Sequence, residues 1–152
     1  GAYALNKNVS GVNNIAVGNA SQYENLTGLR NVAVGTSALR LNTAAIGNNA
    51  FGHYALRNNT TSYNNAFGYS SLASNTTGFQ NSAFGFKSLN NNTRGYSNNA
   101  FGNYALSSNT IGYSNNAFGN NVVPPDVNDN LFNKIGWWFL VNSNNPTKDI
   151  LA

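Results

Sequence analysis

Apolar and polar positions recur along this chain with a period of seventeen residues. The stretch 100–119 reads AFGNYALSSNTIGYSNNAFG and begins and ends on the same Ala-Phe-Gly tripeptide. A fixed period of this size indicates repeated supersecondary units that stack on one another. Counted from Gly1, residues 1–118 form seven units, and the fourth lacks one residue just after Tyr63. Glycines of this type stand at Gly18, Gly35, Gly52, Gly68, Gly85, Gly102 and Gly119.

Other positions of the unit also carry related residues, so that the sequence can be read in columns. Alanine stands two places before each glycine, and Val17, Val34 or a phenylalanine one place before it. The column four places after the glycine holds Leu5, Gln22, Leu39, Leu56, Leu72, Leu89 and Leu106. The column seven places after it is asparagine in every unit: Asn8, Asn25, Asn42, Asn59, Asn75, Asn92 and Asn109.

These columns predict an all-β fold, a repetitive β-solenoid or β-helix with 17-residue coils. Helical repeats need longer periods, and Gly or Asn interrupts every possible helix. We predict one strand on the segment like NNAFG, a second on the segment like YALSS, and a wider turn on NTTGY. Coils stacked about 4.8 Å apart place like residues over like, and seven coils make a rod of roughly 34 Å.

The interior of the rod is expected to hold the alanine, phenylalanine and leucine columns as continuous stripes. In this interpretation Phe67, Phe84, Phe101 and Phe118 point inward. Asparagine stacked on asparagine can form ladders of side-chain amides, as in other stacked-strand assemblies. Glycine and asparagine suit the turns because they adopt positive φ at little cost.

The repeat pattern fades after Gly119. Pro124-Pro125 breaks regular structure, and the run LFNKIGWWFLV at 131–141 is the most apolar of the chain. At eleven residues it is too short and too interrupted to span a bilayer. Because the open end of a stack recruits other chains unless it is covered, we expect a shaft over 1–119 and a capping or tip segment over 120–152.

The composition removes several classes of function. The 152 residues include no cysteine, so disulfides, thiol catalysis and thiolate metal sites are excluded. The net charge of +4 reflects only four acids, and the eight Lys and Arg are scattered along the sequence. Nucleic-acid binding is not expected, since it needs a basic stripe. A chain that starts within the repeat at Gly1 is expected to be a fragment of something longer.

No constellation in the sequence points to catalysis, a cofactor or a metal. His53 stands where other units have residues such as Asn19 and Tyr69, which favours a turn position facing solvent. The segment DVNDN at 126–130 resembles the start of a calcium loop, but Leu131 replaces the required glycine. Asp126 and Asp129 are then read as part of an Asx-rich turn. We therefore predict a non-enzymatic protein.

Two groups of aromatic residues are the candidates for receptor contact. Tyr3, Tyr54 and Tyr104 share the column two places after the glycine and are expected to be exposed. They could stack on sugar rings or pack at a subunit contact. Trp137, Trp138 and Phe139 form one run in the tail. This run could plug the end of a trimer or present aromatic faces to a receptor.

The motifs NNIAVG at 13–18 and RNVAVG at 30–35 resemble the head repeats of YadA-type trimeric autotransporter adhesins. The later units resemble repeats of phage and giant-virus fibre proteins. The resemblance covers 1–119 and implies a β-helix, a homotrimer and a role in attachment. The period of 17 and the bulky phenylalanines depart from the adhesin pattern. Whether each chain coils alone or three chains wind together therefore stays open.

The function expected from these observations is that of a structural and attachment protein, a trimeric surface fibre of a viral tail or capsid. It would lie outside the cell, on the virion surface, and engage a host or cell-surface receptor, with a glycan among the candidates. The alternatives are a bacterial adhesin head on the bacterial outer surface and an ice-binding solenoid. The column Thr43, Thr60, Thr76, Thr93 and Thr110 would suit the last of these.

Overall fold

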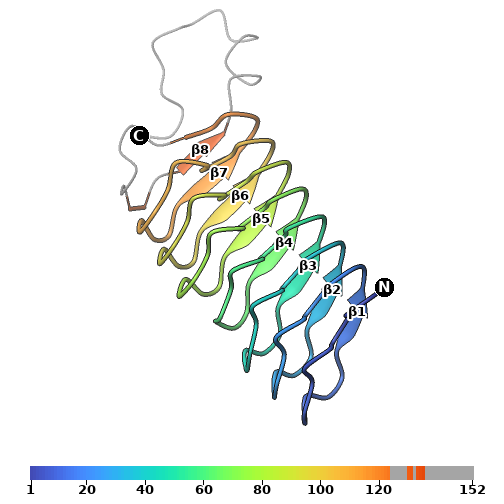
Figure 1. Ribbon diagram of the computed structural model, residues 1–152. Helices are drawn as coiled ribbons and strands as arrows, with labels where there is room; N and C mark the ends of the chain where they lie inside the picture. Colours follow the sequence, from blue (N-terminus) through green and yellow to red (C-terminus); the bar gives the residue numbers. More distant parts are fainter. Residues whose placement is uncertain (124–129, 132, 136–152) are drawn as a thin grey trace, which may run out of the picture.

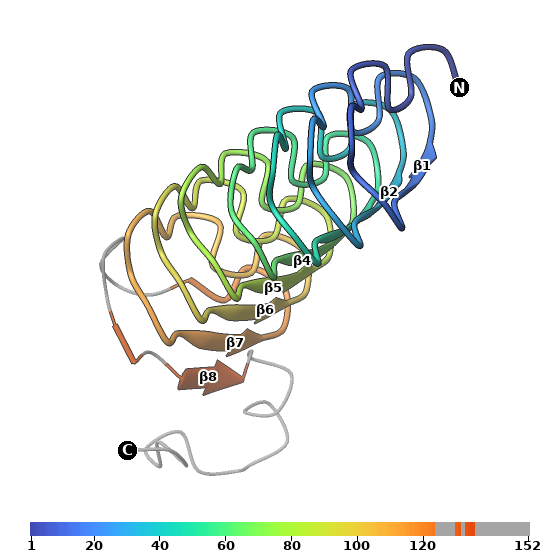
Figure 2. The ribbon, with the colours of Figure 1, turned by 90° about the horizontal axis from the view of Figure 1, so that it is seen from below.

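The computed structural model is a β-solenoid, and it describes residues 1–123, 130–131 and 133–135. These residues form short strands that stack along a rod and contain no helix (Figure 1). The strands lie along one side of the coils, and turns make up the rest of each coil (Figure 2). Their bounds are β1 Ile15–Val17, β2 Val32–Val34, β3 Asn49–Phe51, β4 Asn65–Phe67, β5 Ser82–Phe84, β6 Asn99–Phe101, β7 Asn116–Phe118 and β8 Asn133–Ile135.

Each strand pairs in parallel with the next strand of the same chain, in the order β1 to β8. The register places like residues over like, for example Ala66 beside Ala83 and Phe67 beside Phe84. The expected strand on the segment like NNAFG is therefore confirmed. Each chain coils on itself, which answers the question of single or interwound coils.

The three-residue strands turn only their middle residue into the rod. The alanines in this position are fully buried from β2 to β7. Successive side chains of a strand point to opposite faces, so the residues before and after the alanine lie outside. The predicted inward stripe of Phe67, Phe84, Phe101 and Phe118 is therefore wrong. Phe101 is 36% exposed and Phe118 44%, and the rings of Phe67 and Phe84 are half-buried on the outer face.

The expected second strand, on the segment like YALSS, is also wrong. Residues 52–58 form consecutive turns, and Tyr54 and Leu56 have φ of 61° and 50°. Ala55 N donates to Gly52 O, and Leu56 N donates to Ser71 O of the next coil. Gly52 begins this segment at φ 136°, where an added Cβ would lie 2.5 Å from Gly68 O. The segment YAL therefore does not form a pleated strand. Its first and third residues, Tyr54 and Leu56, adopt the left-handed conformation instead.

The leucine column lines the interior, as predicted, in spite of its left-handed backbone. Leu39, Leu56, Leu72, Leu89 and Leu106 are fully buried with φ between 48° and 50°. A left-handed residue costs about 1–2 kcal/mol. Burial of a leucine side chain contributes about 1.5–3 kcal/mol. Burial thus offsets the strain. Leucine is therefore retained at a position whose backbone conformation Gly or Asn would adopt at a lower conformational cost.

Buried asparagines form the polar half of the interior. In the predicted column, Asn75 Nδ2 donates to Asn59 Oδ1 at 2.7 Å and Asn92 Nδ2 to Asn75 Oδ1 at 2.9 Å, which confirms the amide ladder. A second buried column was not predicted. There the backbone N of Asn98 donates to Asn81 Oδ1 at 3.0 Å. Its buried members are Asn31, Asn48, Asn64, Asn81, Asn98 and Asn115.

The residue that the fourth unit lacks is missing before Tyr63, and not after it as predicted. Tyr63 N donates to Ile46 O, and Gly47 N donates in the same way to Leu29 O, so Tyr63 is the counterpart of Gly47. Asn59 Nδ2 reaches Thr61 O, two residues on, whereas Asn75 reaches Gly78 O, three residues on. The missing residue therefore lies between Asn59 and Thr61. Tyr63 thus stands at the left-handed position that Gly47 and Gln80 occupy in the neighbouring coils, one place after the column of Ile46 and Phe79.

The stack extends into the segment for which a cap was expected. Asn121 N donates to Asn103 O, and β8 pairs with β7. Lys134 stands in β8 beside Ala117, at the position that holds a buried alanine in β2 to β7, and it is exposed. A charged residue in this place disfavours the pairing of another strand. The rest of the tail lies outside the described residues.

Candidate interaction surfaces

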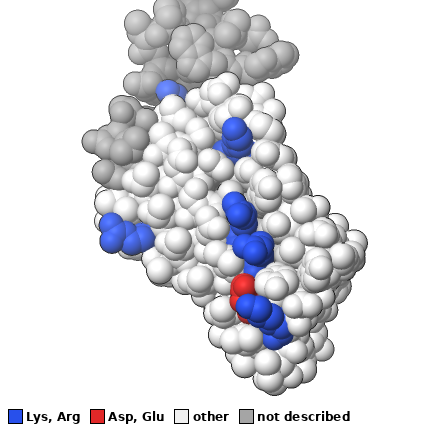
Figure 3. Space-filling model, in the orientation of Figure 1, with Lys and Arg blue, Asp and Glu red and all other residues white. Residues whose placement is uncertain are grey.

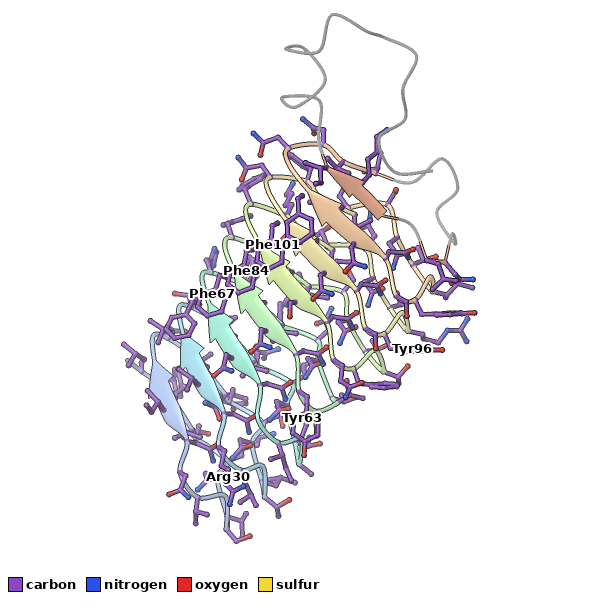
Figure 4. The ribbon with its side chains drawn as sticks, turned by 180° about the vertical axis from the view of Figure 1, so that it is seen from behind. Arg30, Tyr63, Phe67, Phe84, Tyr96 and Phe101 are labelled. Carbon is purple, nitrogen blue, oxygen red and sulfur yellow. The ribbon has the colours of Figure 1, made fainter. Side chains whose placement is uncertain are left out.

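A ladder of five phenylalanines runs along the outer face of the sheet. Neighbouring rings lie with centroids 4.6–5.0 Å apart and planes within 9° of parallel. Figure 4 shows Phe67, Phe84 and Phe101 following one another along the rod. Val17 and Val34 continue this column toward the N-terminus. We call Phe51, Phe67, Phe84, Phe101 and Phe118 the phenylalanine ladder.

A second, shorter stack lies away from this ladder. Phe79, Tyr96 and Tyr113 stack at 5.0 Å between successive centroids, with planes within 6° of parallel. Figure 4 shows Tyr96 at the opposite side of the rod from Phe67, Phe84 and Phe101. Both stacks follow from the in-register pairing, which sets equivalent residues one coil apart. The spacing lets aromatic rings pack in parallel along the rod.

Aromatic and basic side chains gather on the turns that follow the glycine column. Tyr69 lies 5.3 Å from Phe86, which meets Tyr104 edge-on at 5.3 Å. Arg57 lies over the ring of Tyr54 at 5.1 Å, and Lys87 over that of Phe86 at 5.4 Å. We call this surface the basic–aromatic ridge; it consists of Lys7, Tyr23, Arg40, Tyr54, Arg57, Tyr69, Phe86, Lys87 and Tyr104.

The ridge combines neighbouring columns of the coil, in each of which its members stand at equivalent positions of different coils. Glu24 N donates to Arg40 O, and Leu41 N donates to Arg57 O, so that Tyr23, Arg40 and Arg57 form one column. Figure 3 shows Lys and Arg in a row along the rod, with one acid among them. The basic residues appear scattered in the sequence, but the coil brings several of them onto one surface.

The one acid on this surface pairs with the cation at the N-terminal end. Lys7 Nζ lies 2.8 Å from Glu24 Oε2, with side-chain exposures of 47% and 27%. The hydrogen bond to Glu24 raises the pKa of Lys7 above its ordinary value. An exposed pair of this kind contributes little to stability. Its main effect is to neutralise one end of the ridge and to leave Arg40, Arg57 and Lys87 as the net positive part.

The three candidate tyrosines share a column but do not contact one another. Tyr3 is 62% exposed and Tyr104 40%, as expected, whereas Tyr54 is half-buried. Three coils separate each from the next, and each instead meets an aromatic residue nearby: Tyr3 meets Tyr23, Tyr54 meets Tyr69, and Tyr104 meets Phe86. The other candidates, Trp137, Trp138 and Phe139, lie outside the described residues.

The histidine and the threonines that were considered for a chemical or ice-binding role contact other residues of the rod. His53 stacks on Tyr54 with 3.7 Å between ring centroids. Thr60, Thr76 and Thr93 each donate their hydroxyl to a backbone carbonyl of the next coil. In the part of the chain that the structure describes, no three His, Cys, Asp or Glu gather to hold a metal. Asp126 and Asp129 lie outside that part.

A membrane-spanning helix is absent from the same described ranges, in which nothing helical is long and apolar enough to cross a bilayer. No protein-family model, curated protein or solved structure matches this chain.

Proposed function

We propose that this chain is the repetitive part of a homotrimeric surface fibre that serves structure and attachment. The observation that carries the proposal is the phenylalanine ladder. It places five large apolar rings in one partly exposed column on the outer face of a sheet. Continuous apolar surface of this kind on a soluble protein marks an interaction site.

The ladder suits association between copies of the same chain. Strands β1 to β7 carry no charged residue, so this face offers no charge that would have to be desolvated. The column is also straight and periodic, and an identical copy presents the same spacing. Three copies with their ladders turned to a common axis would bury the rings that a single coil leaves half-exposed.

Attachment follows from the shape and from the resemblance of the repeats. A rigid rod projects whatever lies at its end, and its sides offer a long surface for multivalent contact. The units resemble repeats of viral fibres, and NNIAVG resembles the repeats of YadA-type adhesins. The first candidate is a viral tail or capsid fibre at the virion surface. A bacterial adhesin head is the second.

Light scattering of the full chain tests the proposed assembly. We expect a particle of three times 16.2 kDa at micromolar concentration. The double variant F84S/F101S should lower this mass toward that of one chain while the far-ultraviolet circular dichroism is retained. The matched control Y96S/Y113S removes two rings from the second stack and should leave the mass unchanged. A wild-type mass of 16.2 kDa would refute the trimer.

A cell-binding assay tests attachment separately from assembly. Labelled wild-type protein should bind to susceptible host cells and compete with the intact fibre or virion. The F84S/F101S variant should bind more weakly because it presents fewer copies of the site. If a stable trimer binds no surface offered to it, the attachment role is wrong and a purely structural role remains.

A further inference from the structure

The basic–aromatic ridge is a surface that the fold does not require. Equivalent positions in other coils hold small or polar residues: Ala20, Ser37 and Ser70 stand where Tyr54, Lys87 and Tyr104 stand. All of these positions have φ near 55°, a conformation that bulky residues rarely adopt. The left-handed backbone is the same whether this column holds alanine, serine, lysine or tyrosine, so the coil does not require a large side chain there. The large and partly exposed side chains of Tyr54, Lys87 and Tyr104 therefore point to a role outside folding.

The charge of the ridge favours an anionic ligand. Arg40, Arg57 and Lys87 stand on the third, fourth and sixth coils. Glu24 is the single acid among the described residues, and it is paired with Lys7. The remaining three cations therefore give this surface a net positive potential that attracts carboxylates or sulfates.

The aromatic residues favour a sugar as the carrier of that charge. Tyr69 is 42% exposed, Phe86 38% and Tyr104 40%, so that part of each side chain is open to solvent. Lys87 Nζ lies 5.4 Å from the centroid of Phe86 and 6.0 Å from that of Tyr104. The exposed parts of these rings suit the C–H faces of pyranoses, and the cation beside Phe86 and Tyr104 can pair with a charged or polar group of the same sugar.

The spacing of the ridge favours a polymer over a single sugar. Equivalent residues recur at about 4.8 Å, the distance between paired strands. This is close to the rise of one sugar residue in an extended polysaccharide. From Tyr23 to Tyr104 the ridge spans the second to the seventh coil, so that several consecutive sugars can lie along it.

We propose that the basic–aromatic ridge binds an acidic polysaccharide along the axis of the rod, with Arg40, Arg57 and Lys87 pairing with its carboxylates or sulfates and Tyr54, Tyr69, Phe86 and Tyr104 packing against its sugar rings. This inference names the receptor class for the attachment role and in that respect rests on the proposed function. The ridge and the phenylalanine ladder consist of different residues, so association and ligand binding can be tested apart.

The charge density argues against nucleic acid as the ligand. Duplex DNA carries one phosphate per about 1.7 Å of axis, and binding depends on neutralising many of them. Three unpaired cations spread over four coils, roughly 14 Å apart at their ends at the spacing of paired strands, leave most of such a polymer unneutralised. A uronic-acid polymer with neutral sugars between its carboxylates fits this density better.

The test measures binding of the full chain to immobilised polygalacturonate by biolayer interferometry. We expect saturable binding that weakens when salt rises from about 50 mM to about 500 mM, because exposed charges are screened. Dextran, a neutral polymer, should not bind. The variant R40Q/R57Q/K87Q should bind at least about tenfold more weakly, which corresponds to about 1.4 kcal/mol. The variant Y54S/Y104S should bind more weakly at both salt concentrations.

The control variant is R94Q, because Arg94 is exposed and lies outside the ridge. It removes one charge and should leave binding nearly unchanged. Equal loss in R94Q and in a single ridge variant such as R57Q would overturn the proposal, since only net charge would matter. So would equal or tighter binding of single-stranded DNA or of anionic phosphatidylserine vesicles, or an absence of polygalacturonate binding.

The mass of every variant separates this inference from the proposed assembly. If the ridge variants remain trimers and lose polysaccharide binding, both stand. If wild-type trimers bind no acidic polysaccharide, the ridge proposal fails and the fibre proposal is unaffected. If the wild-type chain is a monomer that still binds polygalacturonate, the fibre proposal fails and the ridge proposal stands.

Discussion

The buried amide ladder makes a sharp prediction for Asn92→Ala. Asn92 is fully buried, and its side chain takes part in three hydrogen bonds. Its Nδ2 donates to Asn75 Oδ1 and to Gly95 O, both at 2.9 Å. Its Oδ1 accepts from Asn109 Nδ2 at 2.8 Å. Alanine removes all three bonds at once and leaves the backbone unchanged.

The magnitude follows from what happens to the three partners. Gly95 O also accepts from Asn81 Nδ2, and Asn109 Nδ2 also donates to Gly112 O, so these two groups keep a partner. Among the described residues, Asn75 Oδ1 accepts a hydrogen bond only from Asn92 Nδ2, so it is left unpaired inside the rod. A buried group without a partner costs about 1–3 kcal/mol, and each lost bond contributes about 0.5–1.5 kcal/mol. We therefore expect a destabilisation of about 2.5–7.5 kcal/mol per chain.

The matched control is the neighbouring Asn91→Ala, because Asn91 is exposed on the same turn. Urea unfolding at one fixed protein concentration should show a lowered midpoint for Asn92→Ala and a change within about 0.5 kcal/mol for Asn91→Ala. Repeat arrays can unfold in steps, so the comparison requires coincident transitions by fluorescence and circular dichroism. Equal midpoints for the two variants would show that the ladder does not stabilise the rod, and the reasoning would be wrong.

Three further predictions address single positions. Gln22→Leu should change stability in urea unfolding by less than about 1 kcal/mol, because removal of the buried, unpartnered Oε1 is offset by loss of the bonds that Nε2 donates to Ile15 O and Asn31 O; a larger shift of the midpoint would contradict this. Gly52→Ala should cost at least about 3 kcal/mol, because the new Cβ would lie 2.5 Å from the backbone O of Gly68 at φ 136°; a soluble variant with wild-type stability would refute this close packing. Phe101→Ala should have little effect on the unfolding of a single chain but should weaken the proposed trimer. The loss of unfolding free energy should therefore shrink when the protein is diluted, and a loss independent of protein concentration would argue against a subunit contact.

The columns of the sequence were sufficient to predict the architecture. A period of seventeen residues, with glycine, alanine, leucine and asparagine in register, allows little besides stacked coils. The leucine column and the asparagine column at Asn75 and Asn92 lie in the interior as their recurrence indicated. Such columns are informative because a residue inside a stack contacts its own equivalents above and below, and the same solution is repeated in each coil.

The orientation of the phenylalanines could not be derived from recurrence alone. A stacked aromatic column is regular on either face of a sheet, and in a three-residue strand Ala66 and Phe67 are both apolar. The deciding fact is the small cross-section of the coil, which two asparagine columns, leucine and alanine already fill. The second asparagine column could have been found from Asn81 and Asn98, which recur at the same period.

The basic–aromatic ridge could be recognised only in the folded chain, since neither Arg40 nor Arg57 has a neighbour of like charge in the sequence. They become neighbours because they stand at the same position of the turn on adjacent coils. The tyrosines were chosen correctly as exposed residues at Tyr3 and Tyr104, but their spacing of three coils prevents them from acting as one aromatic column. Their partners come from adjacent columns instead.

The division between constant and variable columns separates folding from recognition in this rod. Positions that hold the same residue in nearly every unit, such as Asn92 and Leu89, are buried and are explained by contacts with the coils above and below. Columns that vary, such as the one with Ser70, Lys87 and Tyr104, lie on turns that close with any of these residues. Aromatic and basic side chains in a variable column therefore need a cause outside the coil, and a ligand that runs along the rod supplies one for several coils at once. Exchanging Lys87 and Tyr104 for serine should thus leave the unfolding midpoint nearly unchanged and reduce polysaccharide binding, whereas a loss of stability comparable with that of Asn92→Ala would show that these residues serve the fold.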